Sequence, residues 1–139
     1  MSVILAYVLT ALGALAICLT HLRLRHSHSG WPLVVHTGAG VVAVVLWLVF
    51  LASRGDGLLS ETARNLVGVI ALAFWWIVVV TGLMLLGRWM PSRSRGKRAA
   101  TTVDAADSWT GTPWLSVLAH VGTLFGVAWF TWAYAISAI

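Results

Sequence analysis

The sequence predicts an all-α integral membrane protein that folds as one four-helix bundle with up-down-up-down topology. Of its 139 residues, 60% are hydrophobic and only 9% are charged, whereas soluble domains carry about 25% charged residues. The apolar residues fall into four runs, and a membrane-spanning helix needs about 20 of them. Four crossings account for the chain as a single transmembrane domain, residues 1–139, without a separate soluble domain.

The first two predicted helices follow from apolar runs and from their boundaries. The first covers about residues 3–22 and has no basic segment before it, which indicates an uncleaved helix and not a secretory signal. The second covers about residues 31–52 and begins at Trp31-Pro32, because proline suits the first turn of a helix.

The third and fourth predicted helices are separated by a long polar segment. A polar link from Ser53 to Thr62 precedes the third helix, which covers about residues 65–90. We expect this helix to end before Pro91, since proline disrupts a helix interior. The fourth helix covers about residues 113–138 and again begins at a proline.

The basic residues predict the orientation of the bundle. The first and third connections lie on one side of the membrane, and the two termini lie on the other. Seven basic residues belong to the side of those connections and two to the other side: Arg23, Arg25, Arg88, Arg93, Arg95, Lys97 and Arg98, against Arg54 and Arg64. The positive-inside rule therefore predicts a multi-pass protein of the cell (plasma) membrane, with both termini outside and the basic loops in the cytoplasm.

The net charge of +5 and the pI near 10.8 favour the anionic headgroups of the lipid bilayer as a partner, and not nucleic acid, because the basic residues lie between apolar runs. The segment from Arg93 to Arg98 is interpreted as a loop held to headgroups, with docking of a partner protein as the alternative. Trp75-Trp76, nearer the middle of the membrane, is predicted to serve helix packing. Three tryptophans at cytoplasmic helix ends predict an aromatic belt: Trp31, Trp89 and Trp114.

Two of the five histidines lie inside apolar runs, where a polar side chain is expensive and indicates a functional site. His36 lies about 7 Å into the second helix, and His120 lies about 10 Å into the fourth. Both helices run outward from the cytoplasmic face, so the two imidazoles are predicted to reach nearly the same level. Two imidazoles at one depth are what a six-coordinate haem iron requires as axial ligands.

The other histidines, His21, His26 and His28, lie at or beyond the end of the first helix, where water reaches them. His26 and His28 form an H-x-H pair, which can bind a transition metal. We interpret all three histidines as solvated loop residues. The single cysteine, Cys18, has no partner in the chain for a disulfide.

Small residues near the two predicted ligands favour a flat cofactor. Gly40 follows His36 by one helical turn and shares its face. Gly82 is predicted at the level of the histidines, and Thr81 beside it is placed to donate a hydrogen bond to an imidazole or to a helix carbonyl. Three arginines at cytoplasmic helix ends are candidates to pair with haem propionates: Arg23, Arg25 and Arg88.

Two short stretches carry a resemblance to a known family. His36-Thr-Gly-Ala-Gly40, and later Val80-Thr-Gly-Leu-Met-Leu-Leu-Gly-Arg-Trp89, resemble small b-type cytochrome membrane subunits and PepSY-associated transmembrane proteins. In those proteins H-x-x-x-G opens one helix and T-G-L closes another. The resemblance covers roughly a third of the chain and implies His36 as an axial ligand and Thr81-Gly82 as haem-packing positions. The fourth helix departs from the pattern, since glycine follows His120 by two residues and not by four, and the chain contains no PepSY domain.

Several function classes are disfavoured, because all four carboxylates lie in predicted polar segments: Asp56, Glu61, Asp104 and Asp107. Proton-coupled transporters and cation channels usually need an intramembrane carboxylate. No hydrolytic triad and no C-x-x-C motif is present. If the chain contributes to an enzyme, we expect it to do so at most as an electron-transfer subunit of an oxidoreductase complex.

Three interpretations of the function remain. The favoured one is a haem b-binding membrane subunit of a respiratory or other redox complex, which passes electrons between a quinone pool or a soluble dehydrogenase and a partner redox protein. If a quinone site exists, we expect it at the helix ends, with Arg23, Arg88, Trp89 or Trp114 as neighbours. The alternative is a cofactor-free accessory subunit of a larger membrane complex, in which the two histidines hydrogen-bond protein groups and Gly122-x-x-x-Gly126 serves close helix packing. A third interpretation replaces haem with (bacterio)chlorophyll held by a single histidine.

Overall fold

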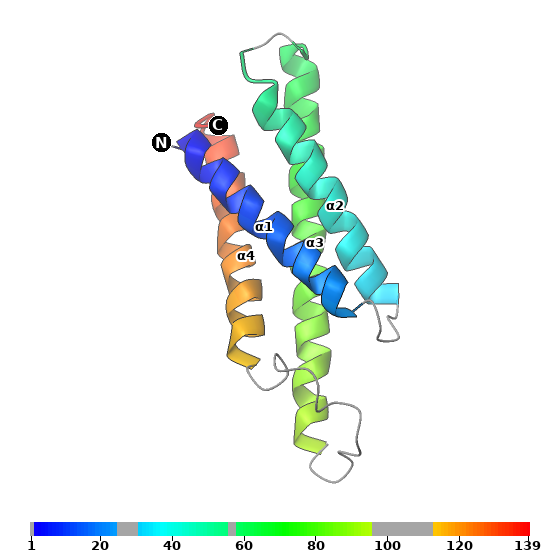
Figure 1. Ribbon diagram of the computed structural model, residues 1–139. Helices are drawn as coiled ribbons and strands as arrows, with labels where there is room; N and C mark the ends of the chain where they lie inside the picture. The colour runs from blue at the N-terminus through cyan, green and yellow to red at the C-terminus, as the bar shows by residue number, and fades with distance from the viewer. Residues whose placement is uncertain (1, 25–30, 56–57, 96–112) are drawn as a thin grey trace.

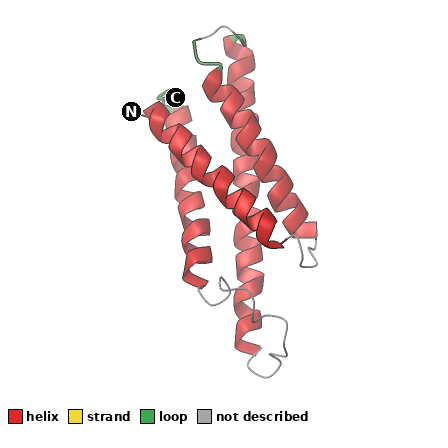
Figure 2. Ribbon diagram, in the orientation of Figure 1, coloured by secondary structure: helices red, strands yellow, loops and turns green. Residues whose placement is uncertain are grey.

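The computed structural model describes residues 2–24, 31–55, 58–95 and 113–139, without the side chains of residues 2, 20–24, 32, 85–95 and 113–116. Within these ranges the protein is helical apart from short turns (Figure 2). Its four helices are α1 (Ser2–Leu24), α2 (Trp31–Ala52), α3 (Glu61–Arg95) and α4 (Pro113–Ala135). The predicted all-α fold class is therefore confirmed.

The helices form a bundle in which sequence neighbours pack side by side. α2 and α3 make the most extensive contact, α1 packs on α2, α4 packs on α3, and α1 also touches α4. α1 crosses the front of the bundle at an angle, and its N-terminus lies beside the C-terminal end of α4 (Figure 1). The up-down-up-down order makes the diagonal pair α2 and α4 run in the same direction.

Three helices of the described residues are long and apolar enough to cross a membrane, over Leu33–Ala52, Glu61–Met84 and Val117–Ala135. The apolar stretch of α1, Val3–Leu19, is shorter than these spans. The protein is thus a helical membrane protein. The remaining expected crossing is α1, a helix of 23 residues. That length corresponds to about 34 Å, slightly more than the hydrocarbon thickness of about 30 Å.

The bounds predicted for the third helix are wrong at both ends. α3 begins at Glu61, because the backbone N–H of Ala63 donates a hydrogen bond to the Ser60 side-chain oxygen at 3.3 Å and so caps the first turn. At the other end the helix continues through Pro91 to Arg95. Membrane helices tolerate a proline that lacks the N–H for one intrahelical bond. Figure 1 shows that the C-terminal end of α3 extends well beyond the neighbouring ends of the other helices.

The core is a cluster of aromatic rings in the half of the bundle nearer the termini. Phe130 on α4 lies between Trp47 of α2, at a ring-centroid distance of 4.8 Å, and Trp75 of α3, at 5.7 Å. All three side chains are buried. Trp75 also packs against Gly13 of α1, where a Cβ would lie 2.7 Å from the indole ring. The predicted packing role of Trp75 is confirmed, and the cluster joins all four helices.

Polar contacts at the same end hold α2, α3 and α4 together. The Arg64 guanidinium lies 4.3 Å from the ring centroid of Phe50, and its Nε donates to the Phe50 carbonyl oxygen at 3.3 Å. The Tyr134 hydroxyl donates to the carbonyl oxygen of Asn65 at 3.0 Å. α4 ends in a Schellman arrangement, with Ser137 at a φ of 54°. These contacts set the spacing of the bundle at the end opposite the two intramembrane histidines.

Candidate functional site

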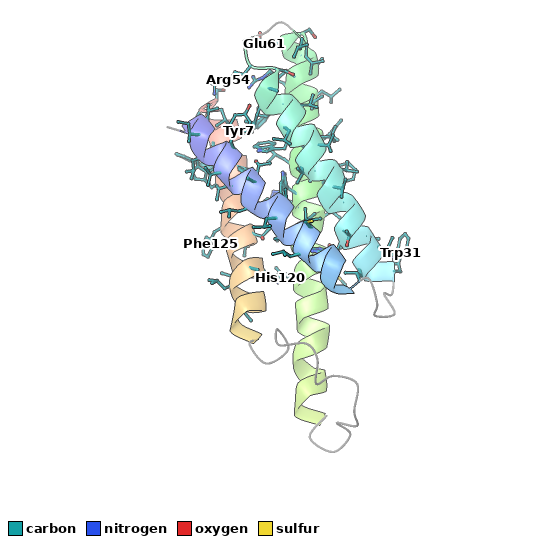
Figure 3. The ribbon with its side chains drawn as sticks, in the orientation of Figure 1. Tyr7, Trp31, Arg54, Glu61, His120 and Phe125 are labelled. Atoms are coloured by element: carbon teal, nitrogen blue, oxygen red, sulfur yellow. The ribbon has the colours of Figure 1, made fainter. Side chains whose placement is uncertain are left out.

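The imidazoles of His36 and His120 lie together inside the bundle. Their ring centroids are 6.2 Å apart and their planes are inclined by 23°. His36 is on α2 and His120 on α4, the diagonal pair of parallel helices. Figure 3 shows His120 on the side of α4 that faces α3, whereas Phe125 points away from the bundle. The two imidazoles therefore lie at one level of the bundle.

A hydrogen bond from α3 holds the ring of His36. Its Nδ1 lies 3.1 Å from the hydroxyl oxygen of Thr81. The same hydroxyl donates to the carbonyl oxygen of Ile77 at 2.7 Å, one turn earlier in α3. Of the two alternatives anticipated for Thr81, the donation to a helix carbonyl is present, and an imidazole lies within hydrogen-bond distance of the same oxygen. The Ile77 carbonyl was not singled out from the sequence, although threonine in a helix regularly bonds the carbonyl four residues before it.

Gly82 brings the backbone of α3 against both imidazoles. A Cβ at this position would lie 2.8 Å from His120 Cδ2 and 2.9 Å from His36 Cε1. Both distances are below 3.0 Å, which real Cβ atoms essentially never show, and both ring atoms belong to half-buried side chains. Glycine is therefore the residue that this approach of α3 requires. The structure thus brings four predicted site residues together: His36, Thr81, Gly82 and His120.

Gly40 has a different neighbour from the one expected. A Cβ there would meet Ile17 of α1 at 2.7 Å and Val78 of α3 at 3.7 Å. Gly40 therefore lets α1 approach α2 one turn from His36, and its nearest contacts are aliphatic. Its role beside a cofactor stays a prediction, whereas its role in helix packing is seen directly.

The glycine pair of α4 makes no close packing contact with the described part of the bundle. A Cβ on Gly122 or on Gly126 would meet no described atom within 4 Å. The expectation that this G-x-x-x-G spacing serves close packing is therefore not realised within the described residues. α4 uses its other face, that of His120 and Phe130, to pack against the bundle.

Several predicted residues fall outside what the structure describes. Arg23 and Arg88 belong to α1 and α3, but their side chains are not described. The same holds for His21, Trp89 and Trp114, while Arg25, His26 and His28 lie outside the described residues altogether. Their roles as propionate, quinone or metal contacts stay predictions. Trp31 is described and is highly exposed at the start of α2, as an aromatic belt requires.

The centroid separation of the two imidazoles matches that of two nitrogen ligands on one metal ion, whereas the close approach of α3 at Gly82 leaves less room than a porphyrin plate needs. Two metal–nitrogen bonds of about 2.0 Å, with each ring centroid about 1.1 Å beyond its nitrogen, give a centroid separation of about 6.2 Å. The observed separation is 6.2 Å. Among the described residues no third histidine, cysteine or carboxylate completes a metal site. A two-ligand donor set falls short of a structural zinc site, which takes four protein ligands, but it suffices for haem iron, whose other ligands come from the porphyrin.

No protein-family model, no curated protein and no solved structure matches this chain. The function must therefore be argued from the fold and from the residues around the two histidines.

Proposed function

We propose that this protein is a membrane subunit that binds haem b and mediates electron transfer in a respiratory or other redox complex. One observation carries the proposal: His36 and His120 face each other on parallel helices at the separation of two axial ligands. Bound haem supplies reversible one-electron chemistry at its iron. The surrounding helices lie in the lipid bilayer and keep water away from the ligands.

Each residue of the site has a defined task in this proposal. His36 and His120 would hold the iron through their ring nitrogens. Thr81 orients His36 through its 3.1 Å contact to Nδ1. Gly82 keeps α3 free of a side chain beside the ring pair. Arg23 and Arg88, at the cytoplasmic ends of α1 and α3, are proposed to pair with the haem propionates.

The proposal includes an orientation and partners. The basic connections lie in the cytoplasm and the termini outside, in the plasma membrane, as the positive-inside rule predicts. A quinone would bind near the cytoplasmic helix ends, close to Arg23, Arg88, Trp89 or Trp114. A donor such as a soluble dehydrogenase and an acceptor redox protein would complete the chain of electron transfer.

A visible absorption spectrum of the detergent-purified protein, oxidised and then reduced with dithionite, tests the haem. We expect a sharp α-band on reduction that disappears in both His36→Ala and His120→Ala. The matched controls are His26→Ala and His28→Ala, which remove histidines outside the apolar runs and should leave the band unchanged. A colourless wild-type protein, after expression with ample haem, would contradict the proposal.

The second candidate function is that of a cofactor-free accessory subunit, and the Gly82 contact favours it. The backbone of α3 lies directly against both imidazoles, whereas a porphyrin is a plate much wider than an imidazole and needs α3 to lie farther from the axis between the rings. In this function His36 hydrogen-bonds Thr81 and the ring pair packs three helices together. The same spectra separate the two functions, since the accessory subunit binds no haem.

A further inference from the structure

We propose that Thr81 is a positioning residue that selects the tautomer of His36, so that Nδ1 carries the proton and Nε2 carries the lone pair. In a neutral imidazole one nitrogen donates and the other accepts, and the hydrogen bond made by one nitrogen decides the role of the other. The partner of His36 Nδ1 is the Thr81 hydroxyl. If Nδ1 donates in that bond, Nε2 carries a lone pair, and if Nδ1 accepts, Nε2 carries the proton.

The two shortest contacts of the Thr81 oxygen indicate the direction, and a third contact joins it to the Val78 carbonyl oxygen at 3.3 Å. The hydroxyl has one proton to donate. Its contact to the Ile77 carbonyl, at 2.7 Å, has the usual length of an O–H···O bond, about 2.7–2.8 Å. Its contact to His36 Nδ1, at 3.1 Å, lies within the range of N–H···O bonds, about 2.7–3.2 Å. The hydroxyl proton thus points to Ile77, and the oxygen accepts the proton of Nδ1.

The protein contains a second example of this motif in which the direction is not in question. The indole Nε1 of Trp76 lies 3.1 Å from the hydroxyl oxygen of Thr131, and that hydroxyl donates to the carbonyl of Val127 at 2.9 Å. An indole nitrogen can only donate. Thr131 therefore accepts from an aromatic ring N–H while it donates to the carbonyl four residues before it. Thr81 and His36 repeat this arrangement between α3 and α2.

The consequence for the cofactor rests on the proposed function. Histidines that bind metals donate their second ring N–H to a protein oxygen, which sets the tautomer and the orientation of the ring. With Nδ1 committed to Thr81, Nε2 of His36 is the nitrogen available to an iron. The tautomer itself does not depend on a metal, so it can be tested in protein without haem.

The test is ¹⁵N NMR of ring-labelled histidine in detergent-solubilised protein without haem, at pH about 8.5, about two units above the usual histidine pKa of about 6.5. The signal of His36 is assigned by its loss in His36→Gln. We expect a protonated-type shift at Nδ1 and an unprotonated-type shift at Nε2 in the wild type. Thr81→Val removes the hydroxyl acceptor but keeps the backbone hydrogen bond of the ring to Val78, so it should raise the fraction of the Nε2–H form, and Thr81→Ser should restore the wild-type pattern.

The matched control is Thr131→Val, which removes the corresponding hydroxyl from the other motif and should leave the tautomer of His36 unchanged. A wild-type His36 that carries its proton on Nε2 would overturn the inference, and this result needs no folded variant. So would an unchanged tautomer in Thr81→Val. If the wild-type protein shows the Nδ1–H form and binds no haem, the tautomer assignment stands and the proposed function fails. If it binds haem with His36 protonated on Nε2 beforehand, the assignment fails and the proposed function stands.

Discussion

His36 and His120 meet inside the bundle although their helices, α2 and α4, make no backbone contact with each other in the described part of the chain. Both helices flank α3, and Gly82 of α3 lies against both rings. The site therefore depends on three helices at once. A substitution on α3 that forms no bond to either histidine can therefore still separate the two imidazoles or tilt their planes.

Gly82→Ala is expected to disrupt the site by overpacking. Its Cβ would lie under 3.0 Å from atoms of both imidazoles, and overpacking typically costs about 1–3 kcal/mol. If this cost falls on the haem-bound form, haem affinity should drop by about 5- to 150-fold. Haem titration followed by its absorption measures this change. Gly122→Ala, at a position where a Cβ meets no described atom, is the control and should bind haem like the wild type, so equal loss in both variants would contradict the role of Gly82.

Gly13→Ala is expected to destabilise the bundle without a direct effect on the imidazoles. The added Cβ would lie 2.7 Å from the ring of Trp75, a rigid side chain that is only 2% exposed. The expected loss is about 1–3 kcal/mol, seen as a lower thermal unfolding midpoint in detergent. Gly126→Ala is the matched control, because nothing described lies within 4 Å of its Cβ. An unchanged midpoint in Gly13→Ala would show that α1 does not dock on Trp75.

Phe130→Ala is expected to open a cavity between α2, α3 and α4. Phe130 is 2% exposed and contacts the rings of Trp47 and Trp75. Large-to-small changes of buried aromatic residues cost about 3–5 kcal/mol. Phe125→Ala, on the outer face of α4 where Phe125 is 69% exposed, should change stability by less than about 0.5 kcal/mol. Chemical unfolding in detergent compares the two variants, and similar losses would argue against an aromatic core at this position.

The orientation of the bundle can be tested by cysteine labelling in a Cys18→Ala background. Leu58→Cys lies in the link between α2 and α3, where Leu58 is 71% exposed, and we expect it to react with a membrane-impermeant maleimide on intact cells. Ala99→Cys lies beside the basic segment and should react only after permeabilisation, because the positive-inside rule places that segment in the cytoplasm. The opposite labelling pattern would invert the topology.

The helix bounds show where local sequence signals are sufficient. The start of α2 at Trp31 and of α4 at Pro113 agree with prediction, because proline in the first turn is a local signal. The bounds of α3 do not agree. α3 starts where Ser60 caps its first turn. Serine is a common N-cap residue, but Ser60 falls within the polar link that the sequence predicts. The end of α3 lies beyond Pro91, and a proline alone does not decide where a membrane helix stops.

The candidate site likewise combines features that the sequence predicts with features that only helix packing determines. Helix periodicity and depth placed His36 and His120 at one level and named Thr81 and Gly82 as neighbours, because rise per residue is a property of every α-helix. Sequence spacing did not reveal that Gly40 meets Ile17, since the rotation of one helix about its axis relative to another is set by packing. The same reason explains why the docking of Trp75 on Gly13 was not anticipated.

Hydrophobicity, charge distribution and helical rise are local or additive properties of the chain, and they were enough to establish a membrane bundle of four helices with two polar side chains at one depth. Which faces of those helices meet, and how closely, follows from the interlocking of side chains that are far apart along the chain. The 6.2 Å separation of the imidazoles, the hydrogen bond from α3 to His36 and the close approach at Gly82 are all of this second kind, because each joins residues of two or three different helices.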